Sequence, residues 1–546
     1  MTQLSAIRAR PHVLPAIKGE TLAFVALVLV LCLQLNLALT KPINWDEYYH
    51  FSLIHAHVRG EQVDIFQTPF VHLYGWVTRL PGTTVDHILT IRALILPFEL
   101  LLVGAVILSA RRFTDRQTAL LAGLAYATAG YAFTQGFALR ADVIAAALLM
   151  SAVAIALHLR FTAITLTLIA LLIGLAFVST IKAMLYLPVF LAIAYLRRSE
   201  LSRWSVPLLV ASAGVAALAL YEVPGFGDKL SGKLIGSAMR MFGGGLIPQS
   251  ETWIVQLIIA PFFTILLVAA VLILLRKSDS SWPRATLLLF ALPALWPLIY
   301  LNSYPYFFAF ILPPVAVAIA PSLAMAVGRY RVFTLVACLS LNALLIWAVQ
   351  PREQLATQRQ FQKNVRAIFP EPVSYIDESG VLGDYPRAVS RFASGWALES
   401  YRDKGRALYS EHILAEPTPL LIANSSALQD IFAPHLVEEK RLLPADRALI
   451  RNNYIPACGM IFVAGKRLAP GQQSLEDLVA VPGKYIVTDG PLVIDGVMFE
   501  EGATITLKRR RYTFSNPSNQ HVTLRWADSS DADCSPITLN EFYAGY

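Results

Sequence analysis

A series of long apolar segments, separated by short charged connections, occupies the first 350 residues of the chain and constrains its fold more than any other feature. Each has roughly the 20 residues that a helix needs to cross the hydrocarbon core of a bilayer. The whole chain is 56% hydrophobic and only 15% charged, unlike a soluble globular protein. We therefore predict a mainly α-helical, polytopic membrane protein with about eleven transmembrane helices. The expected spans are about 21–40, 87–110, 117–134, 142–159, 162–180, 183–196, 205–222, 254–275, 285–301, 306–327 and 332–350.

The basic residues indicate how these helices are oriented. Lys and Arg gather in alternate connections, whereas the other connections carry acids such as Asp64 and Glu222. By the positive-inside rule the basic connections and the N-terminus are cytoplasmic, and an odd number of spans puts the C-terminus outside. The net charge of +8 is thus a topology signal and does not indicate nucleic-acid binding. The basic connections hold Arg8, Arg10, Lys18, Arg111, Arg112, Arg116, Arg160, Arg197, Arg198, Arg203, Arg276, Lys277, Arg284, Arg329 and Arg331.

After residue 350 the chain becomes polar and contains no further span. Two short apolar runs with helical stretches between them predict a small α/β domain over 351–468. Short alternating runs separated by Asp-Gly and Glu-Gly pairs predict a small β-sandwich over 469–546. The chain therefore divides into a transmembrane domain, residues 1–350, and these two extracytoplasmic domains.

The four cysteines fit this topology. Cys32 and Cys338 fall in spans, where a thiol is a small apolar group. Cys458 and Cys534 fall in the outer region, an oxidising place in bacterial membrane proteins, so we expect them to form a disulfide. The alternative is that they are two unrelated thiols.

Asp46 and Glu47 lie just past the first span, in the segment Asn44-Trp45-Asp46-Glu47-Tyr48-Tyr49-His50. Adjacent carboxylates at a bilayer edge are costly unless something uses them. On a helix Asp46 and His50 share one face, and a carboxylate at the rim of an apolar cavity can act as a general base. The alternative is that the two acids cap the start of a juxtamembrane helix.

Five of the ten histidines fall in or beside the same outer loop, which favours a polar cavity. Histidine side chains can bind a divalent metal, but these five could equally sit at headgroup level, and we predict no metal site. They are His50, His55, His57, His72 and His87.

Isolated charges mark other outer edges of the predicted spans. Arg140 and Asp142 interrupt an apolar stretch before the fourth span, and Lys182 lies at the end of the fifth. Arginine is a natural clamp for phosphate, and Lys182 is interpreted as a second phosphate contact. The alternative for both cations is that they extend to the bilayer interface.

Two further features belong to the predicted outer face. Tyr304 and Tyr306 form an aromatic edge that could stack on a sugar or line a lipid groove, or could simply be an interface belt. The outer loop 222–253 is rich in glycine and could act as a lid.

Nucleotide-binding motifs are missing from the sequence. It contains no P-loop, no glycine-rich dinucleotide fingerprint after a strand and no Gly-x-Ser-x-Gly elbow. The cytoplasmic connections are also too short to hold a nucleotide-sugar domain. Any chemistry should therefore use a lipid-linked donor on the outer face.

The membrane part resembles the GT-C superfamily of integral-membrane glycosyltransferases, in particular the branch of protein O-mannosyltransferases and lipid A aminoarabinose transferases. The resemblance is carried by Asp46-Glu47 in a long first outer loop, by Arg140-x-Asp142 after the third span, by the N-in topology with many spans and by the outer C-terminal region. It implies a polyprenyl-phosphate sugar as donor substrate, with no certain cofactor. Asp46 would deprotonate an acceptor hydroxyl that attacks with inversion, and Arg140 and Lys182 would hold the phosphate.

The same resemblance implies further roles and a location. Glu47 would orient the acceptor or the sugar, and the remaining expected substrate-binding residues are His50, Asp142, Tyr304 and Tyr306. The protein would lie in the bacterial cytoplasmic (inner) membrane and transfer a sugar to a lipid, glycan or protein acceptor. Two other classes remain open, namely a transporter or lipid flippase, and a non-catalytic protein of glycan assembly.

Overall fold

The computed structural model describes residues 18–61, 68–201, 209–210, 214, 241–276, 282–329, 331–389, 395–531 and 533–543. The predicted span 205–222 lies almost wholly outside these ranges, and so does most of the predicted lid, 222–253. The chain divides into two compact units. The helical unit comprises Met1–Leu37, Leu96–Phe137 and Asp142–Val349, and the β-containing unit comprises Ala38–Ile95, Ala138–Ala141 and Gln350–Tyr546.

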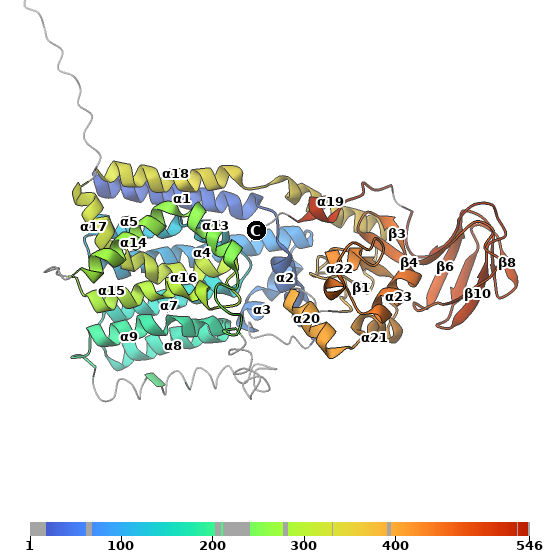
Figure 1. Ribbon diagram of the computed structural model, residues 1–546, viewed down its shortest axis with the longest axis horizontal. Helices are drawn as coiled ribbons and strands as arrows, with labels where there is room; N and C mark the ends of the chain where they lie inside the picture. The colour runs from blue at the N-terminus through green and yellow to red at the C-terminus, as the bar shows by residue number, and fades with distance from the viewer. Residues whose placement is uncertain are drawn as a thin grey trace, which may run out of the picture. The chain divides into compact units, whose positions relative to one another are not determined.

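Apolar helices build the helical unit (Figure 1). Polar side chains fix where some of them begin: Asp115 accepts the N–H of Thr118 at 2.9 Å at the start of α5. Three helices, α1, α4 and α7, have residues in both units. The helices are α1 (Gly19–Thr40), α4 (Thr84–Arg111), α5 (Arg116–Ala127), α6 (Tyr131–Gln135), α7 (Ala141–His158), α8 (Ala163–Ser179), η2 (Ile181–Tyr186), α9 (Leu187–Leu196), α13 (Ser250–Ile259), α14 (Pro261–Leu275), α15 (Arg284–Ala291), η3 (Leu292–Leu298), α16 (Pro305–Ala318), α17 (Ala320–Arg329) and α18 (Val332–Val349).

Four helical segments in the described ranges are long and apolar enough to cross a bilayer, and six are if each of two bent pairs counts as one span. Three shorter apolar helices accompany them. These segments support a polytopic membrane protein, while the number of eleven spans stays a prediction.

One predicted span, 254–275, was wrong in its continuity. The structure breaks it into α13 and α14, which meet at an angle of 93° at Ala260. Pro261 has no N–H to donate and disfavours a helical backbone at the residue before it. Ala260 accordingly has φ −127° and ψ 50°. The segment is a broken span or a re-entrant loop.

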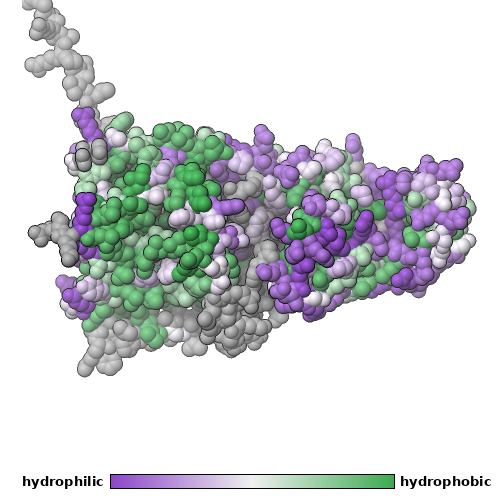
Figure 2. Space-filling model, viewed as in Figure 1, coloured by the Kyte–Doolittle hydropathy of each residue, from purple (hydrophilic) through white to green (hydrophobic). Residues whose placement is uncertain are grey.

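The surface of the helical unit is apolar. Side chains over α1, α14, α15 and α18 are mostly hydrophobic on the face that Figure 2 shows, and Ile265 and Phe333 are 62% and 67% exposed. An apolar surface of this kind in water would mark an interaction site, and a lipid environment accounts for it here. Within this surface α1 and α18 lie side by side (Figure 1), where Trp347 Nε1 donates to Asn36 Oδ1 at 2.9 Å.

Two sheets form the core of the β-containing unit. The first has the order β1-β2-β4-β11-β6-β9, with β3 paired to β4, and only β1 and β2 are parallel. The second has the order β5-β10-β7-β8 and is antiparallel. The strands are β1 (Tyr375–Ile376), β2 (Leu420–Ile422), β3 (Tyr454–Cys458), β4 (Ile461–Leu468), β5 (Leu475–Leu478), β6 (Gly483–Thr488), β7 (Leu492–Ile494), β8 (Val497–Phe499), β9 (Thr504–Leu507), β10 (Arg511–Ser515) and β11 (Val522–Trp526).

Helices complete this unit, and its surface over the strands is largely hydrophilic (Figure 2). Its helices are α2 (Trp45–Val58), α3 (Thr68–Tyr74), η1 (Gly75–Arg79), α19 (Glu353–Ile368), α20 (Gly395–Lys404), α21 (Leu408–Ala415), α22 (Ser426–Gln429), η4 (Glu438–Lys440), α23 (Pro444–Asn453) and α24 (Leu539–Phe542).

Turn chemistry and strand pairing shape the outer region. Asp495 and Gly496, with φ of 51° and 80°, make the tight turn between β7 and β8, as the Asp-Gly pair indicates. The long strand β4 pairs with both β2 and β3 over its first residues and with β11 over its last residues. The first sheet therefore continues across residue 468, where the sequence places a domain boundary. That boundary stays a prediction.

Cys458 and Cys534 are bonded to each other, with Cα atoms 6.5 Å apart and a separation of 76 positions in the sequence. A bond that closes so long a loop restricts the unfolded chain. Replacing both cysteines with serine is expected to lower the free energy of unfolding by about 2–4 kcal/mol. Thermal unfolding of the purified protein measures this, with Cys32→Ala as the control. An unchanged melting temperature in the double serine variant would contradict the expectation.

Candidate functional site

The start of α2 is fixed by a capping box. Asn44 Oδ1 accepts the backbone N–H groups of Asp46 at 3.0 Å and Glu47 at 2.9 Å, and Glu47 Oε2 accepts the N–H of Asn44 at 3.3 Å. Asn44 and Glu47 therefore cap the helix. Asp46 supplies only its backbone N–H to the cap, so its carboxylate serves other contacts.

The carboxylate of Asp46 forms an ion pair with the guanidinium of Arg140. Both side chains are buried, with exposed fractions of 9% and 6%. His50, one turn along α2, places its Nε2 atom 3.6 Å from Asp46 Oδ1. We call Asp46, His50 and Arg140 the Asp46 cluster. A buried charge pair of this kind is energetically expensive to build and is weak evidence for stability alone.

Glu47 faces a second arginine, Arg92 of α4. Arg92 Nε donates to Glu47 Oε1 at 2.7 Å and Nη2 donates to Oε2 at 2.5 Å, a bidentate pair in which both side chains are fully buried. The backbone N–H of Leu139 donates to Glu47 Oε1 at 2.9 Å. Although burial raises the pKa of Glu47, the charge and hydrogen bonds of Arg92 outweigh it, and the net effect lowers this pKa.

Arg92 also binds the backbone of the segment that follows α1. Its Nη1 atom donates to the carbonyl of Lys41 at 2.6 Å, and Nη2 donates to that of Pro42 at 2.9 Å. Burial and the nearby Arg92 lower the pKa of the Lys41 ammonium to about 8. Neither Arg92 nor Lys41 is among the residues predicted from the sequence. The available signal for Arg92 was a charge inside the predicted span 87–110, which is rare unless the charge has a function or a partner.

These contacts occupy the side chain of Glu47. Both of its oxygens are occupied and its side chain has no exposed surface, so it does not meet a substrate in this arrangement. Instead it holds the backbone at Leu139, immediately before Arg140. The substrate-orienting role that the resemblance implies for Glu47 stays a prediction.

A second group of the predicted residues meets within the helical unit. Lys182 Nζ lies 2.6 Å from Asp142 Oδ1, and both side chains are buried. The same ammonium lies 4.7 Å from the centroid of the Tyr306 ring, a cation–π distance. Tyr306 donates to Asn302 at 2.7 Å, and its ring lies 6.1 Å from that of Tyr304. We call Asp142, Lys182 and Tyr306 the Lys182 cluster.

The five histidines of the first outer loop do not gather. His55 packs edge-on against Phe51, His87 Nε2 lies 2.8 Å from the carbonyl of Leu80, and the His57 and His72 rings are 4.0 Å apart. Burial lowers the pKa of His55 to about 3, which keeps that ring neutral. Within the ranges that the structure describes, no three His, Cys, Asp or Glu side chains are arranged to hold a metal.

An apolar cavity of about 300 Å³ lies among α7, α8, η2 and α9. Ala183 and Met184, the two residues after Lys182, form part of its wall. Such a cavity suits a hydrocarbon chain and offers no partner for a charged group.

Comparison with known proteins shows the fold. No protein-family model and no curated protein matches the sequence. The crystal structure of ArnT from Cupriavidus metallidurans bound to undecaprenyl phosphate is similar to this chain, with a TM-score of 0.52 and 12% identity over 77% of this chain and 96% of ArnT. The chain has the GT-C fold. The same protein in its apo state gives a TM-score of 0.50 at 13% identity, over 77% of this chain and 95% of ArnT.

Another structure that the chain resembles is the apo oligosaccharyltransferase of Archaeoglobus fulgidus, with a TM-score of 0.46 and 11% identity over 94% of this chain and 99% of that one. The fold implied by the sequence resemblance is therefore confirmed through ArnT, and with it a polytopic membrane protein. At these identities the likeness concerns the fold, and the roles of single residues depend on the geometry described above.

Proposed function

We propose that this protein is a glycosyltransferase that moves a sugar from a polyprenyl-phosphate donor to an acceptor hydroxyl on the extracytoplasmic face. The observation that carries the proposal is the buried pair of Asp46 and Arg140, which brings a base and a phosphate-binding cation into contact. The GT-C fold supports a reaction of this class. The ArnT structure with undecaprenyl phosphate supports the choice of lipid carrier.

In the proposed reaction Asp46 accepts the proton of the acceptor hydroxyl while the oxygen of that hydroxyl attacks the anomeric carbon of the donor sugar. The bond from that carbon to the phosphate oxygen breaks on the opposite face, so the configuration inverts. The electron pair leaves on the polyprenyl phosphate, whose new charge requires a cation. Arg140 is suited to this role because a guanidinium can bind two oxygens at once. The donor phosphate would then bind the Arg140 guanidinium in place of the Asp46 carboxylate or beside it. The carboxylate would thereby be free to act as the base.

His50 is proposed as an auxiliary of the base. Its Nε2 atom, 3.6 Å from Asp46, can orient the carboxylate or receive the proton from it. Glu47 and Arg92 keep the backbone of Leu139 in place, so Arg140 stays opposite Asp46.

We propose that the Lys182 cluster binds the donor as well. Lys182 offers a cation for phosphate, and the rings of Tyr304 and Tyr306 offer faces for a sugar. The apolar cavity beside Met184 offers space for the first isoprene units. Exchange of Asp142 for phosphate at the ammonium would parallel the exchange proposed at Arg140. No metal is required by this scheme.

Lys182→Met is expected to raise the dissociation constant for undecaprenyl phosphate roughly 10- to 100-fold, as the loss of one charged hydrogen bond implies. Lys182→Arg should retain most of the binding. Asp142→Asn is the decisive companion because it leaves the ammonium without its carboxylate partner. If Lys182 binds phosphate, Asp142→Asn should bind the lipid as tightly as the wild type or more tightly. Equal loss in Lys182→Met and Asp142→Asn would indicate a purely structural pair. Isothermal titration in nanodiscs gives these constants.

The activity itself is tested in proteoliposomes with a panel of polyprenyl-phosphate sugars and a total membrane extract as acceptor. Mass spectrometry would follow release of free polyprenyl phosphate and addition of the sugar to an acceptor. A transferase releases the lipid phosphate. A flippase would carry the intact lipid-linked sugar across the bilayer. A non-catalytic assembly protein would bind a glycan without releasing the lipid phosphate or moving the lipid-linked sugar. Transport of the intact lipid-linked sugar, or glycan binding alone, would contradict the proposal.

We further propose the topology that the basic connections predict, with the N-terminus in the cytoplasm, the outer region beyond residue 350 in the periplasm and the helices in the bacterial inner membrane. This orientation places the Asp46 cluster on the side of the membrane whose compartment contains lipid-linked sugars but lacks nucleotide sugars. Labelling of Cys458 in a reduced Cys534→Ser variant of intact cells would report on which side the outer region lies.

A further inference from the structure

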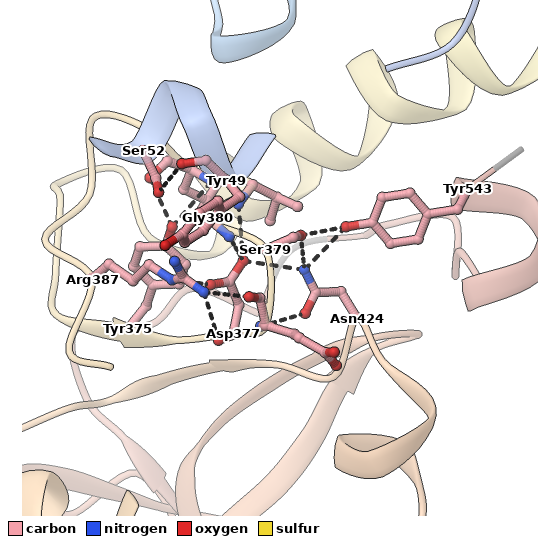
Figure 3. Close-up of polar contacts among 12 residues, drawn as sticks. Tyr49, Ser52, Tyr375, Asp377, Ser379, Gly380, Arg387, Asn424 and Tyr543 are labelled. Carbon is pink, nitrogen blue, oxygen red and sulfur yellow. Dashed lines mark hydrogen bonds and ion pairs between the residues drawn. The ribbon is translucent and has the colours of Figure 1, made fainter. Parts of the chain in front are cut away.

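Helix α2 has two working faces. Asp46 and His50 lie on one face, whereas Tyr48, Ser52 and His55 lie toward the opposite face, about 120–180° away at 100° per residue. The second face packs against a segment more than 300 residues later in the chain, residues 377–387, which we call the Asp377 loop. Figure 3 shows Tyr49 and Ser52 of α2 beside Gly380 of this loop.

The contact between helix and loop has no spare room. Gly380 has φ of +79°, and a Cβ atom there would meet Cβ and Oγ of Ser52. A Cβ atom on Gly383 would meet the rings of His55 and Phe51. Cβ of Ser52 is fixed to the helix backbone and cannot rotate away, so a larger residue at 380 has to move α2 or the loop.

Hydrogen bonds tie the same loop to the C-terminal end of α2 and to the start of α4. The N–H of Gly383 donates to Thr84 Oγ1 at 2.9 Å, at the first residue of α4. The carbonyl of Gly383 accepts from Arg59 Nη1 at 3.2 Å, at the C-cap of α2. The loop thus holds the C-terminal part of α2 and links it to the helix that carries Arg92.

The Asp377 loop is itself held rigidly by its first residue. The fully buried carboxylate of Asp377 accepts the N–H groups of Gly380 at 2.6 Å and Val381 at 2.9 Å. Arg387 Nε donates to it at 2.7 Å, and Asn424 Nδ2 donates to it at 3.1 Å (Figure 3). Four donors on one buried carboxylate leave this loop little freedom to follow a moving helix.

The end of the chain completes the support. Tyr543 shares a hydrogen bond with Ser379, and Asn424 donates to Ser379 Oγ at 2.9 Å. Tyr48 of α2 stacks on Phe542, with ring centroids 5.9 Å apart, and meets Tyr543 edge-on at 6.5 Å. The second face of α2 is therefore covered by the Asp377 loop together with residues 542–543.

We propose that the Asp377 loop is a positioning element for the transfer reaction, which holds Asp46 opposite Arg140 by fixing the far face of α2. This inference rests on the proposed function, and it gives the outer region a part in the chemical step itself. Because a displacement of about 1 Å at a reacting group can cost about 100-fold in rate, a small shift of α2 should act on kcat. Donor binding should change little, since the residues proposed to bind the donor lie outside the loop.

The test compares Gly380→Ala with Gly496→Ala. Gly496 has almost the same φ, +80°, but no atom lies within 4 Å of its added Cβ, so it controls for backbone strain. We expect Gly380→Ala to lower kcat roughly 10- to 100-fold with KM for the donor within threefold of the wild type. Gly496→Ala should leave both constants unchanged. Removing the opposing side chain in Gly380→Ala/Ser52→Gly should restore at least a tenth of the lost rate.

Hydrogen exchange of α2 separates this inference from the proposed function. Gly380→Ala should increase exchange in residues 45–58, Gly496→Ala should not, and neither result depends on knowing the substrate. If Gly380→Ala alters hydrogen exchange in α2 while the wild type shows no transferase activity, the support of α2 by the loop stands and the proposed function is refuted. An active wild type with unchanged kcat in Gly380→Ala would refute the inference. A loss of kcat in Gly380→Ala that the additional Ser52→Gly substitution does not rescue would also refute the inference.

Discussion

Replacing Asp46 with asparagine is expected to lower kcat for sugar transfer by roughly 10²–10⁴-fold, the usual contribution of a general base. The side chain keeps its size and can still accept a hydrogen bond from Arg140, so the protein should fold and bind polyprenyl phosphate. The loss should appear in kcat, with KM for the donor within about tenfold of the wild type. Steady-state rates in proteoliposomes, together with circular dichroism, measure both parts of this expectation.

Asp86→Asn is the matched control for this variant. Asp86 belongs to the same unit and also pairs with an arginine, Arg359, but both side chains are more than 40% exposed. Such a pair contributes about 1 kcal/mol or less, so this variant should retain nearly full activity. Full activity in Asp46→Asn would remove the base assignment, and equal losses in the two variants would point to a general electrostatic effect.

Replacing Arg92 with methionine is expected to lower the free energy of unfolding by about 3–5 kcal/mol. The reason is that Glu47 would then be left as a fully buried carboxylate without its counter-charge, and the carbonyls of Lys41 and Pro42 would lose their donor. Chemical or thermal unfolding in detergent, followed by tryptophan fluorescence, measures the loss. A change of less than 1 kcal/mol would contradict the account of Glu47 and Arg92 as a structural pair.

The double variant Arg92→Met/Glu47→Gln is the control, because removal of both charges should recover a large part of the loss. Acidity provides a second check. The folded pKa of Glu47 lies below its ordinary value of 4.5, so its contribution to stability is present above that pH and is lost as the pH falls through the folded pKa. Arg92→Met removes the charge and hydrogen bonds of Arg92, which lower this pKa, so the pKa should rise and the gap in stability between wild type and variant should narrow on acidification.

The sequence was sufficient for features that depend on composition and local pattern. Apolar length and basic connections indicate a polytopic membrane protein, and the isolated positions of Asp46, Arg140 and Lys182 single them out as candidates. Asp-Gly pairs located hairpin turns such as that at Asp495. These signals need no knowledge of which segments meet.

Contacts between distant segments could not be predicted in this way. Arg92 was missed because its neighbours form an apolar span, and only the fold brings Glu47 to it. The packing of Gly380 on Ser52 joins residues far apart in the chain, and no period in the sequence encodes it. The contact of Glu47 with Leu139 was missed for the same reason, since the two residues lie 92 positions apart.

The break between α13 and α14 has a different cause. Hydropathy averages over a window and does not register one proline, although Pro261 is sufficient to end a helix. In a broken span the freed backbone groups need partners. The carbonyl of Ile259 accepts from Asn342 Nδ2 at 3.0 Å, a contact that a window average cannot reveal.

The most direct test of the central claim is a structure of the protein with undecaprenyl phosphate bound in a nanodisc. We expect the phosphate to lie within hydrogen-bonding distance of the Arg140 guanidinium, with the Asp46 carboxylate beside it and free to reach an acceptor. A phosphate seated away from Arg140, with the ion pair of Asp46 and Arg140 unchanged, would contradict it.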